Sequence, residues 1–153
     1  MKSRFKIIID KREQKPYSFP EWIETARGSL KTGDYAVYGD DYFAVERKSL
    51  NDFIGTISSG WARFCRELKR MDDANYPAKV IMIEADFEEI CFKKFEDEIK
   101  GPEHDHVDIT PQFIIKRIAE LALRGAIVIF AGNRSYAMAL TLTILQQRYK
   151  KLG

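Results

Sequence analysis

The chain has 153 residues, of which 45% are hydrophobic and 31% are charged, and its 25 Lys and Arg nearly balance its 23 Asp and Glu. This composition is typical of a folded globular domain and excludes a disordered, collagen-like or disulfide-stapled chain. The net charge of +2 neither requires nor excludes nucleic acid, because a nucleic-acid-binding protein needs basic groups on only one face.

The amino-terminal residues are not expected to form a targeting or membrane segment. Met1 to Lys6 precedes only three isoleucines before Asp10, too short for a signal-peptide core or a membrane span. We therefore expect a protein that is not secreted and has no membrane partner, in the cytoplasm of a bacterium or phage-infected cell or in a eukaryotic nucleus. Cys65 and Cys91 lie in apolar segments without metal-binding spacing and are expected to be buried thiols.

The first predicted elements are a strand and a short helix. The run 5–9 is short, β-branched and apolar, which predicts a buried strand that carries Asp10 to its carboxyl edge. Pro16 and Pro20 interrupt the chain after this strand. The stretch Pro20 to Glu24 is consistent with a short helix, since proline there precedes an acidic first turn.

A β-hairpin is predicted next. The β-rich runs 35–38 and 42–45 flank Gly39-Asp40-Asp41, whose composition suits a three-residue hairpin loop. With that loop, the strand register places Asp34 opposite Glu46, and their Cβ atoms are about 5 Å apart. A two-residue loop would shift the register by one residue and send these carboxylates to opposite faces.

The second half of the chain alternates helices and strands. Apolar residues at steps of three and four between Leu50 and Met71 predict an amphipathic helix, interrupted near Ser58-Ser59-Gly60. The remaining expected elements are strands at 79–83 and 126–130 and helices at 111–123 and 136–152. This order predicts an α/β fold, a mixed central sheet flanked by helices, with the hairpin antiparallel and the later strands parallel.

Asp34, Glu46 and Lys48 form the candidate catalytic group. Residues 46 and 48 share one face of a strand, whereas Arg47 points away from it. Mg²⁺ or Mn²⁺ binds a couple of carboxylates and keeps waters and substrate phosphate in its other positions. A lysine beside such an ion would help to position an attacking water.

Further charged residues map near the same sheet edge. Asp10 and Glu13 are candidates for direct or indirect support of the metal. Arg12 and Arg47 are candidates either for holding phosphate oxygens or for pairing with neighbouring carboxylates. Asp52, one turn into the following helix, is a candidate for orienting the basic residues of the strand by hydrogen bonding.

Three other charged segments are either candidate sites or solvated surface, and only the first leaves both interpretations open. Four basic residues on the predicted helix, which either follow a DNA backbone or form a solvated face, are Arg63, Arg66, Lys69 and Arg70. His104-Asp105-His106 lies in an acidic stretch and is expected to be a surface loop rather than a metal site. Asp86, Glu88 and Glu89 are expected to be a polar stretch after a strand.

The conjunction of motifs resembles a known family. Asp10-Lys11-Arg12-Glu13, Gly33-Asp34 and Glu46-Arg47-Lys48-Ser49-Leu50-Asn51-Asp52 are similar to the signature of the XPF-type structure-selective endonucleases. Their nuclease domain belongs to the PD-(D/E)xK superfamily, so the resemblance implies a restriction-endonuclease-like core. It covers essentially the whole chain, and residues 1–153 are expected to be one nuclease domain without the helix-hairpin-helix module of larger members.

The resemblance also implies a function and roles. It implies a Mg²⁺- or Mn²⁺-dependent endonuclease that hydrolyses phosphodiester bonds of branched, forked or flapped DNA in repair or recombination. By matching position, Asp34 and Glu46 would be metal ligands with Glu13 and Asp10 nearby, and Lys48 would assist the water. The implied site-forming residues are Arg12, Arg47 and Asp52.

Three alternatives stay open from the sequence. The chain could be a noncatalytic DNA-structure-binding subunit, since the family also contains partners with decayed sites, although the intact acids and lysine argue against decay. It could also be a related nuclease that cuts four-way junctions or linear duplex. Family members pair through nuclease-domain helices, so Ile144, Leu145 and Tyr149 belong either to a homodimer face or to the core.

Overall fold

The computed structural model of the chain describes residues 4–92 and 109–153. Its strands are β1 (Ile7–Asp10), β2 (Thr25–Gly28), β3 (Tyr35–Val37), β4 (Val45–Lys48), β5 (Lys79–Ile83) and β6 (Ala126–Phe130). Its helices are α1 (Leu50–Ile57), α2 (Trp61–Asp73), α3 (Phe87–Phe92), α5 (Pro111–Leu123) and α6 (Arg134–Leu152). The chain thus has the predicted α/β fold.

The strands form one six-stranded mixed sheet in the order β2-β1-β3-β4-β5-β6. Strand β3 is antiparallel to both β1 and β4, whereas β4, β5 and β6 run parallel to one another. The antiparallel hairpin and the parallel later strands are as predicted. Strand β2 adds a parallel partner to the outer edge of β1. Strand β4 lies inside the sheet, between β3 and β5.

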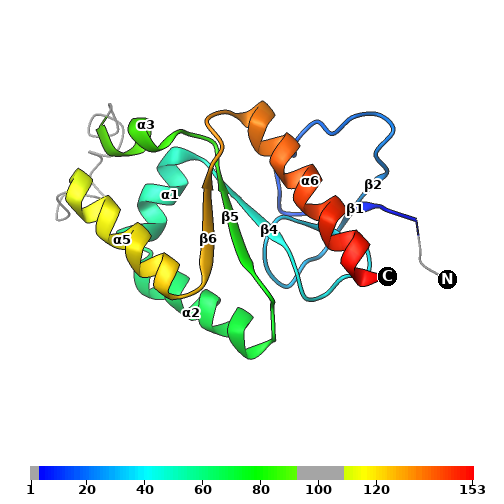
Figure 1. The fold of residues 1–153 in the computed structure, drawn as a ribbon, viewed down its shortest axis with the longest axis horizontal. Coiled ribbons are helices and arrows are strands. Elements are labelled where there is room, and N and C mark those ends of the chain that lie inside the picture. Colours follow the sequence, from blue (N-terminus) through cyan, green and yellow to red (C-terminus); the bar gives the residue numbers. More distant parts are fainter. Residues whose placement is uncertain (1–3, 93–108) are drawn as a thin grey trace.

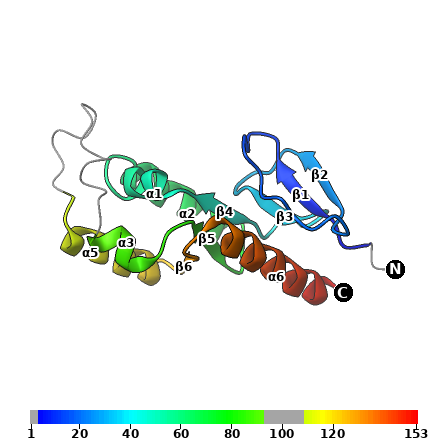
Figure 2. The ribbon, with the colours of Figure 1, turned by 90° about the horizontal axis from the view of Figure 1, so that it is seen from above.

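Helices cover the two faces of the sheet unequally (Figure 1 and Figure 2). Ile81 and Ile83 of β5 pack in a hydrophobic core with residues of α1, α2 and α5. The alternate residues Val80 and Met82 pack in a second core with residues of α6. Burying an aliphatic side chain of this size stabilises a fold by about 1.5–3 kcal/mol. Strand β5 is therefore apolar on both faces, which explains its unbroken hydrophobic run.

The predicted break in the long amphipathic helix is confirmed. Helix α1 ends at Ile57 and α2 begins at Trp61, with residues 58–60 as the connection. A Cβ at Gly60 would lie 3.1 Å from the carbonyl oxygen of Gly55 and 3.3 Å from the Cα of Thr56. Glycine therefore allows the two helices to approach closely at this point, and the junction between them becomes one wall of the site described below.

The prediction of a short helix at 20–24 is wrong. The chain makes a turn there, in which the N–H of Ile23 donates to the carbonyl of Pro20 at 2.9 Å, and strand β2 follows. One turn of acidic residues after a proline cannot sustain a helix without a tertiary partner. Strand β2 is short, and its residues are exposed or half-buried, so its sequence carries little strand signal until it pairs with β1.

The polar stretch after β5 begins an additional short helix, α3. Oδ1 of Asp86 accepts the backbone N–H of Glu89 at 2.6 Å, which supports the first turn of this helix. Cys91 on α3 is buried as expected, and Cys65 on α2 is half-buried; both are free thiols. The segment His104-Asp105-His106 lies outside the described residues.

Helix α6 packs along the sheet face that includes β3 and β5 (Figure 2). Leu145 is fully buried in the second core, Ile144 packs against that core, and the Tyr149 ring lies 5.3 Å from the Phe5 ring. All three residues therefore pack within the chain, and homodimerisation stays a prediction. Neither α6 nor another helix in the described part of the chain is long and apolar enough to cross a membrane.

Candidate active site

Strand β4 supplies the centre of the candidate site. Nζ of Lys48 lies 3.8 Å from Oε1 of Glu46, two residues earlier on the strand. The intervening Arg47 reaches in a different direction and contacts Glu13 and Glu84. The predicted same-face arrangement of Glu46 and Lys48 is confirmed, and it follows from the alternation of side chains along a strand.

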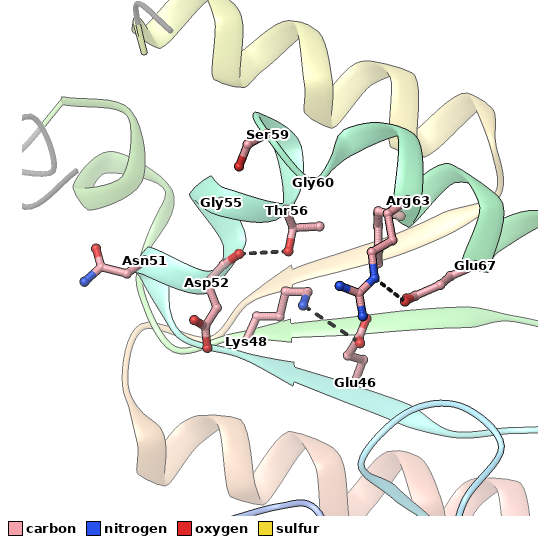
Figure 3. Close-up of a pocket in the computed structure, with 11 residues that line it drawn as sticks. Glu46, Lys48, Asn51, Asp52, Gly55, Thr56, Ser59, Gly60, Arg63 and Glu67 are labelled. Carbon is pink, nitrogen blue, oxygen red and sulfur yellow. Dashed lines mark hydrogen bonds and ion pairs between the residues drawn. The ribbon is translucent and has the colours of Figure 1, made fainter. Parts of the chain in front are cut away.

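Glu46 and Lys48 line an open cavity of about 530 Å³ between β4 and helices α1 and α2 (Figure 3). The charged and amide-bearing residues of its wall are Glu46, Lys48, Asn51, Asp52, Arg63 and Glu67. Ligand sites commonly have volumes of roughly 300–1,000 Å³. Because its walls carry charges of both signs, this cavity suits a charged substrate with a bound cation better than an apolar ligand.

Helix α1 presents Asp52 to the cavity. Oγ of Ser49 accepts the backbone N–H of Asp52 at 3.2 Å, which caps the helix directly after β4. Asp52 also accepts a hydrogen bond from the hydroxyl of Thr56 through its carbonyl oxygen at 2.8 Å. Within the described residues its carboxylate has no hydrogen bond to Arg47 or Lys48. Asp52 thus shares the cavity with Lys48 but does not orient it by a direct hydrogen bond.

Asp34 lies at the start of β3 beside Glu46. The observed pair Tyr35 and Val45 has the predicted register. The predicted three-residue loop is wrong, because residues 38–44 form a longer connection between β3 and β4. The N–H of Asp34 donates to the carbonyl of Val45 at 2.9 Å, and its Oδ2 accepts the N–H of Arg47 at 2.8 Å. These two bonds lie on either side of Glu46 along β4. Asp34 thus adjoins Glu46, although it is not part of the cavity wall.

The two carboxylates have shifted pKa values. Burial raises the pKa of Glu46 to about 7; the positive charge of Lys48 opposes this shift, and the negative charges of Asp34 and Glu67 add to it. Burial is also the main cause that raises the pKa of Asp34, against the hydrogen bond from the Arg47 N–H. The Glu46 side chain is 27% exposed because one side opens into the cavity. Two adjacent acids of this kind are stabilised as carboxylates by a cation.

Asp10, at the end of β1, is only 1% exposed and is held by protein donors. Its oxygens accept four hydrogen bonds of 2.8–3.2 Å, three from the backbone and guanidinium of Arg12 and one from the N–H of Leu30. Burial raises the pKa of Asp10, but the hydrogen bonds from Arg12 and Leu30 outweigh this effect and lower the pKa to about 2. Asp10 is therefore a charged anchor for Arg12.

Arg12 is held by Asp10 and is otherwise exposed. Its side chain is 71% exposed. The hydrogen bond with Asp10 raises the pKa of the Arg12 guanidinium, and the charges of Asp34 and Glu67 act in the same direction. Arg12 is thus an exposed cation anchored on Asp10, whose backbone N–H donates to the carbonyl of Asp34 at 2.9 Å.

Glu13 and Arg47 form a separate ionic group. Oε1 of Glu13 accepts from Nη1 of Arg47 at 3.0 Å, and its Oε2 accepts from the hydroxyl of Tyr35 at 3.3 Å. Arg47 also donates through Nε to Glu84, the residue after β5. The side chains of Glu13, Arg47 and Glu84 are 9%, 17% and 13% exposed. Two roles were predicted for Arg47, and the contacts observed are those of pairing with carboxylates.

The basic residues of α2 are exposed beside the cavity. Arg63 lines both the cavity and a neighbouring hollow of about 640 Å³, whose other basic members are Arg66, Lys69 and Arg70. Glu67 and Asp73 share this hollow and pair with Arg63 at 3.9 Å and with Lys69 at 3.2 Å. Exposed pairs of this kind contribute under about 1 kcal/mol and break readily. The four cations are thus available to a polyanion.

Sequence reasoning missed some residues that the fold brings to the site. Glu67 faces the cavity one helical turn after Arg63, a spacing that the sequence contains (Figure 3). Glu84 follows directly on β5, whose carboxyl end lies beside that of β4 in the parallel pair. Polar residues at such strand ends are a recognised site signal. Arg134, by contrast, reaches Glu84 from α6, and no local pattern indicates that contact.

The carboxylates of Asp34 and Glu46 are the candidate oxygen ligands for a divalent ion. Within residues 4–92 and 109–153, no three Asp, Glu, His or Cys side chains converge closely enough to hold an ion by themselves. Mg²⁺ commonly uses only one or two carboxylates with waters and phosphate. In the described structure Oδ1 of Asp34 accepts no hydrogen bond, and Glu46 has only the long contact with Lys48. The oxygen donors of Asp34 and Glu46 thus fit such an ion.

Comparisons with known proteins identify the fold and the family of the chain. The family model described as the ERCC4 domain matches residues 9–143. A structure of XPF from Aeropyrum pernix is similar to this chain, with a TM-score of 0.64 and 16% identity. The match covers 96% of this chain and 66% of that chain. A second, described as XPF from Aeropyrum pernix in complex with DNA, has a TM-score of 0.66 and 18% identity, with 97% and 66% covered.

This chain therefore spans just under two thirds of the length of these structures, and at such identities the likeness shows the fold alone. No curated protein sequence matches the chain. The family model, however, covers most of the chain, including every residue of the cavity wall. The chain belongs to the ERCC4 (XPF nuclease) domain family.

Proposed function

We propose that the chain is a Mg²⁺- or Mn²⁺-dependent DNA endonuclease that hydrolyses phosphodiester bonds of branched, forked or flapped DNA. The observation that supports this most is the meeting of Glu46 and Lys48 in one open cavity, with Asp34 adjoining Glu46. Acidic oxygens and a lysine in contact are the groups that metal-assisted phosphodiester hydrolysis uses.

In this proposal Asp34 and Glu46 hold the metal ion. An ion held there would supply positive charge at the scissile phosphate and lower the pKa of a bound water. Lys48 is held 3.8 Å from Glu46 and over the Phe64 ring at 5.8 Å. From there its ammonium group can donate hydrogen bonds to the attacking water or a phosphate oxygen.

The two arginines have different proposed roles. Arg12 is exposed and anchored on Asp10, so its guanidinium can bind a phosphate oxygen beside the cavity. Arg47 is largely buried and occupied by Glu13 and Glu84, so it fixes the framework around the site. Asp10 and Glu13 accordingly support the metal-binding residues indirectly. Asp52 contributes negative charge to the cavity next to Lys48.

The basic residues of α2 provide a path for the DNA backbone that leads away from the cavity. Arg63 belongs to both hollows, so a strand whose phosphate occupies the cavity can continue toward Arg66, Lys69 and Arg70. The similar Aeropyrum pernix protein was solved in complex with DNA. Branched, forked or flapped DNA is proposed as substrate because such structures offer a strand that can leave the duplex at the cut.

A noncatalytic DNA-structure-binding role is the second candidate function. It would use the basic residues of α2 without requiring the lysine of the cavity. A nuclease for four-way junctions or linear duplex is the third. The position of Lys48 against Glu46 favours catalysis over binding alone.

The experiment compares labelled fork, flap, four-way and linear duplex DNA incubated with Mg²⁺, with Mn²⁺ and with EDTA. Wild-type protein is expected to cut fork or flap DNA with either metal and not with EDTA. Lys48→Ala should reduce the rate by about 10²–10⁴-fold, the usual loss for a catalytic proton-handling group. Lys116→Ala, which removes an exposed lysine of α5, is the matched control and should cut as wild type does.

Each alternative has its own result. Tight DNA binding without cutting under either metal would support the noncatalytic subunit. Preferential cutting of four-way or linear DNA would redirect the substrate proposal. Cutting that persists in EDTA and in Lys48→Ala would contradict the proposed mechanism.

A further inference from the structure

Four charged side chains lie on the face of β4 turned away from the cavity, and we term them the charge cluster: Glu13, Arg47, Glu84 and Arg134. Arg47 donates to both glutamates, through Nε and Nη2 to Glu84 and through Nη1 to Glu13 at 3.0 Å. Nη1 of Arg134 lies 3.6 Å from Oε1 of Glu84. Two positive and two negative charges therefore balance one another in a largely buried place, where an unmatched charge is costly.

Arg134 links the charge cluster to the segment that follows β1. Its Nη2 donates to the backbone carbonyl of Lys15 and, at 2.7 Å, to that of Pro16. Carbonyls in an irregular segment need such donors, because no ladder partner satisfies them. Arg134, the first residue of α6, thus holds a segment more than a hundred residues away in the chain.

The ring of Tyr17 contacts both arginines of the charge cluster. The guanidinium carbon of Arg47 lies 5.6 Å from the ring centroid of Tyr17, and that of Arg134 lies 5.2 Å from it. The Tyr17 ring stacks on the Tyr35 ring at 4.8 Å, and the Tyr17 N–H donates to the Tyr35 hydroxyl at 2.9 Å. Cation-to-ring contacts of this kind fix the planes of both guanidinium groups.

The segment held in this way carries candidate site residues. Residues 11–17 include Arg12, which is anchored on Asp10 next to the backbone of Asp34, and Glu13, which binds Arg47 of β4. Strand β4 in turn carries Glu46 and Lys48 into the cavity. Glu84 is the common partner, since it contacts the arginine of β4 and the arginine of α6 together.

We propose that Glu84 and Arg134 are positioning residues that lock residues 11–17 against β4 and so set Arg12 beside the acidic residues of the site. The catalytic consequence rests on the proposed nuclease function. The mechanical part, the locking of residues 11–17, does not depend on it and is measured separately.

The first variant is Glu84→Gln, which keeps the size of the side chain and removes its charge. Backbone hydrogen exchange is followed at Arg12, Glu13, Lys15 and Tyr17, whose N–H groups are hydrogen-bonded in the locked segment. We expect exchange there to be faster by about tenfold or more. The matched control is Glu88→Gln, an exposed glutamate of α3, which should leave the exchange unchanged.

The second readout separates positioning from stability. In single-turnover cleavage at saturating DNA and metal, Glu84→Gln should lower the rate by about tenfold or more, because a misplaced reacting group loses rate steeply. Its dissociation constant for DNA should rise far less than the rate falls, since the basic residues of α2 are untouched and only the Arg12 contact is disturbed. Glu88→Gln should match wild type in both quantities.

Arg134→Ala and Arg134→Lys keep the test decisive if Glu84→Gln folds poorly, because Arg134 is 40% exposed. Arg134→Ala should speed exchange at residues 11–17 and slow cleavage, and Arg134→Lys should recover part of both. Combined with Glu84→Gln, Arg134→Ala should add less than its separate effect, as expected for residues in one network.

Wild-type exchange rates at residues 11–17 in both Glu84→Gln and Arg134→Ala would overturn the proposal, whatever the activity. Faster exchange with an unchanged cleavage rate would overturn the positioning role. If the wild-type protein cuts no DNA at all, the proposed function fails, and the exchange measurement alone then decides whether the two residues lock the segment.

Discussion

Single residues near the site carry the same charge and do different things, as the two arginines Arg12 and Arg47 show. Arg12 is 71% exposed and holds on to Asp10, whereas Arg47 is 17% exposed and holds Glu13 and Glu84. Burial decides the difference, because a buried guanidinium must be paired with carboxylates and has no donors left for a substrate. Both arginines stand in the matched motif, and only the structure separates their roles.

Arg47→Ala should lower the free energy of unfolding by about 3–5 kcal/mol, because it leaves Glu13 and Glu84 without their shared partner in a buried place. Urea denaturation of the metal-free protein measures this. Arg63→Ala is the matched control, since its side chain is 82% exposed and its pair with Glu67 should contribute under about 1 kcal/mol. Equal losses in the two variants would contradict the assignment of Arg47 to the framework.

Asp10 predicts a loss of stability in acid. Its pKa is lowered to about 2 from the ordinary 3.8, so the folded state favours the carboxylate more than the unfolded state does. Its contribution is therefore fully present above about pH 4 and is lost as the pH falls toward 2. The difference in unfolding free energy between wild type and Asp10→Asn should shrink over this range. Asp41→Asn, an exposed change in the hairpin loop, should show no such trend.

At the scale of elements, the β3–β4 hairpin places Asp34 next to Glu46, and helix α2 carries the exposed basic residues beside the cavity. The hairpin depends on Gly33, which has φ of 79° and leads directly into Asp34. A Cβ at Gly33 would lie 2.6 Å from the Cβ of Ala44. The backbone there needs both the left-handed conformation and the missing side chain.

Gly33→Ala should therefore destabilise the protein by about 1–2 kcal/mol for the conformation, and by a further roughly 1–3 kcal/mol for the overlap with Ala44. Gly39→Ala is a sharp control, because Gly39 has φ of 87° but nothing within 4 Å of a new Cβ. Thermal unfolding of both variants gives the comparison. An equal effect of the two substitutions would show that the close approach to Ala44 is unimportant.

The basic residues of α2 lead to a prediction for how the affinity for DNA depends on salt concentration. If Arg66 and Arg70 contact phosphates, the double variant Arg66→Ala with Arg70→Ala should reduce the slope of log K against log salt by about 0.9 per lost contact with duplex DNA. Anisotropy titrations at several salt concentrations measure this slope. Lys116→Ala, on α5, should leave the slope unchanged. A wild-type slope in the double variant would remove α2 from the DNA path.

For the whole molecule, local patterns predicted the later elements well. Helix α5 has the predicted bounds, because Thr110 caps it and Pro111 starts it, and both signals are local. The failures are elements and contacts that depend on distant partners. Strand β2 exists because β1 pairs with it. Helix α3 is an exception, because it begins on a local cap in which Asp86 accepts the N–H of Glu89.

The candidate site shows the same division. The shared face of Glu46 and Lys48 follows from a period of two, and the sequence also predicted the hairpin register, although the loop is longer than the predicted three residues. Glu84 and Arg134 join Arg47 from 37 and 87 residues away along the chain, and periodicity contains no information about such meetings. Tertiary packing alone turns the motif into a cavity on one face of β4 and a charge cluster on the other.

The central claim is that the cavity at β4 is the centre of a metal-dependent DNA endonuclease. Its most direct test is the single-turnover rate of forked-DNA cleavage in Mg²⁺ for wild type, Glu46→Gln and the surface control Glu88→Gln. The account predicts that Glu46→Gln cuts at least about 100-fold more slowly while still binding the fork, as for the loss of one strong electrostatic contact to the transition state. It also predicts that Glu88→Gln cuts as wild type does. Cleavage by Glu46→Gln at the wild-type rate would contradict the account.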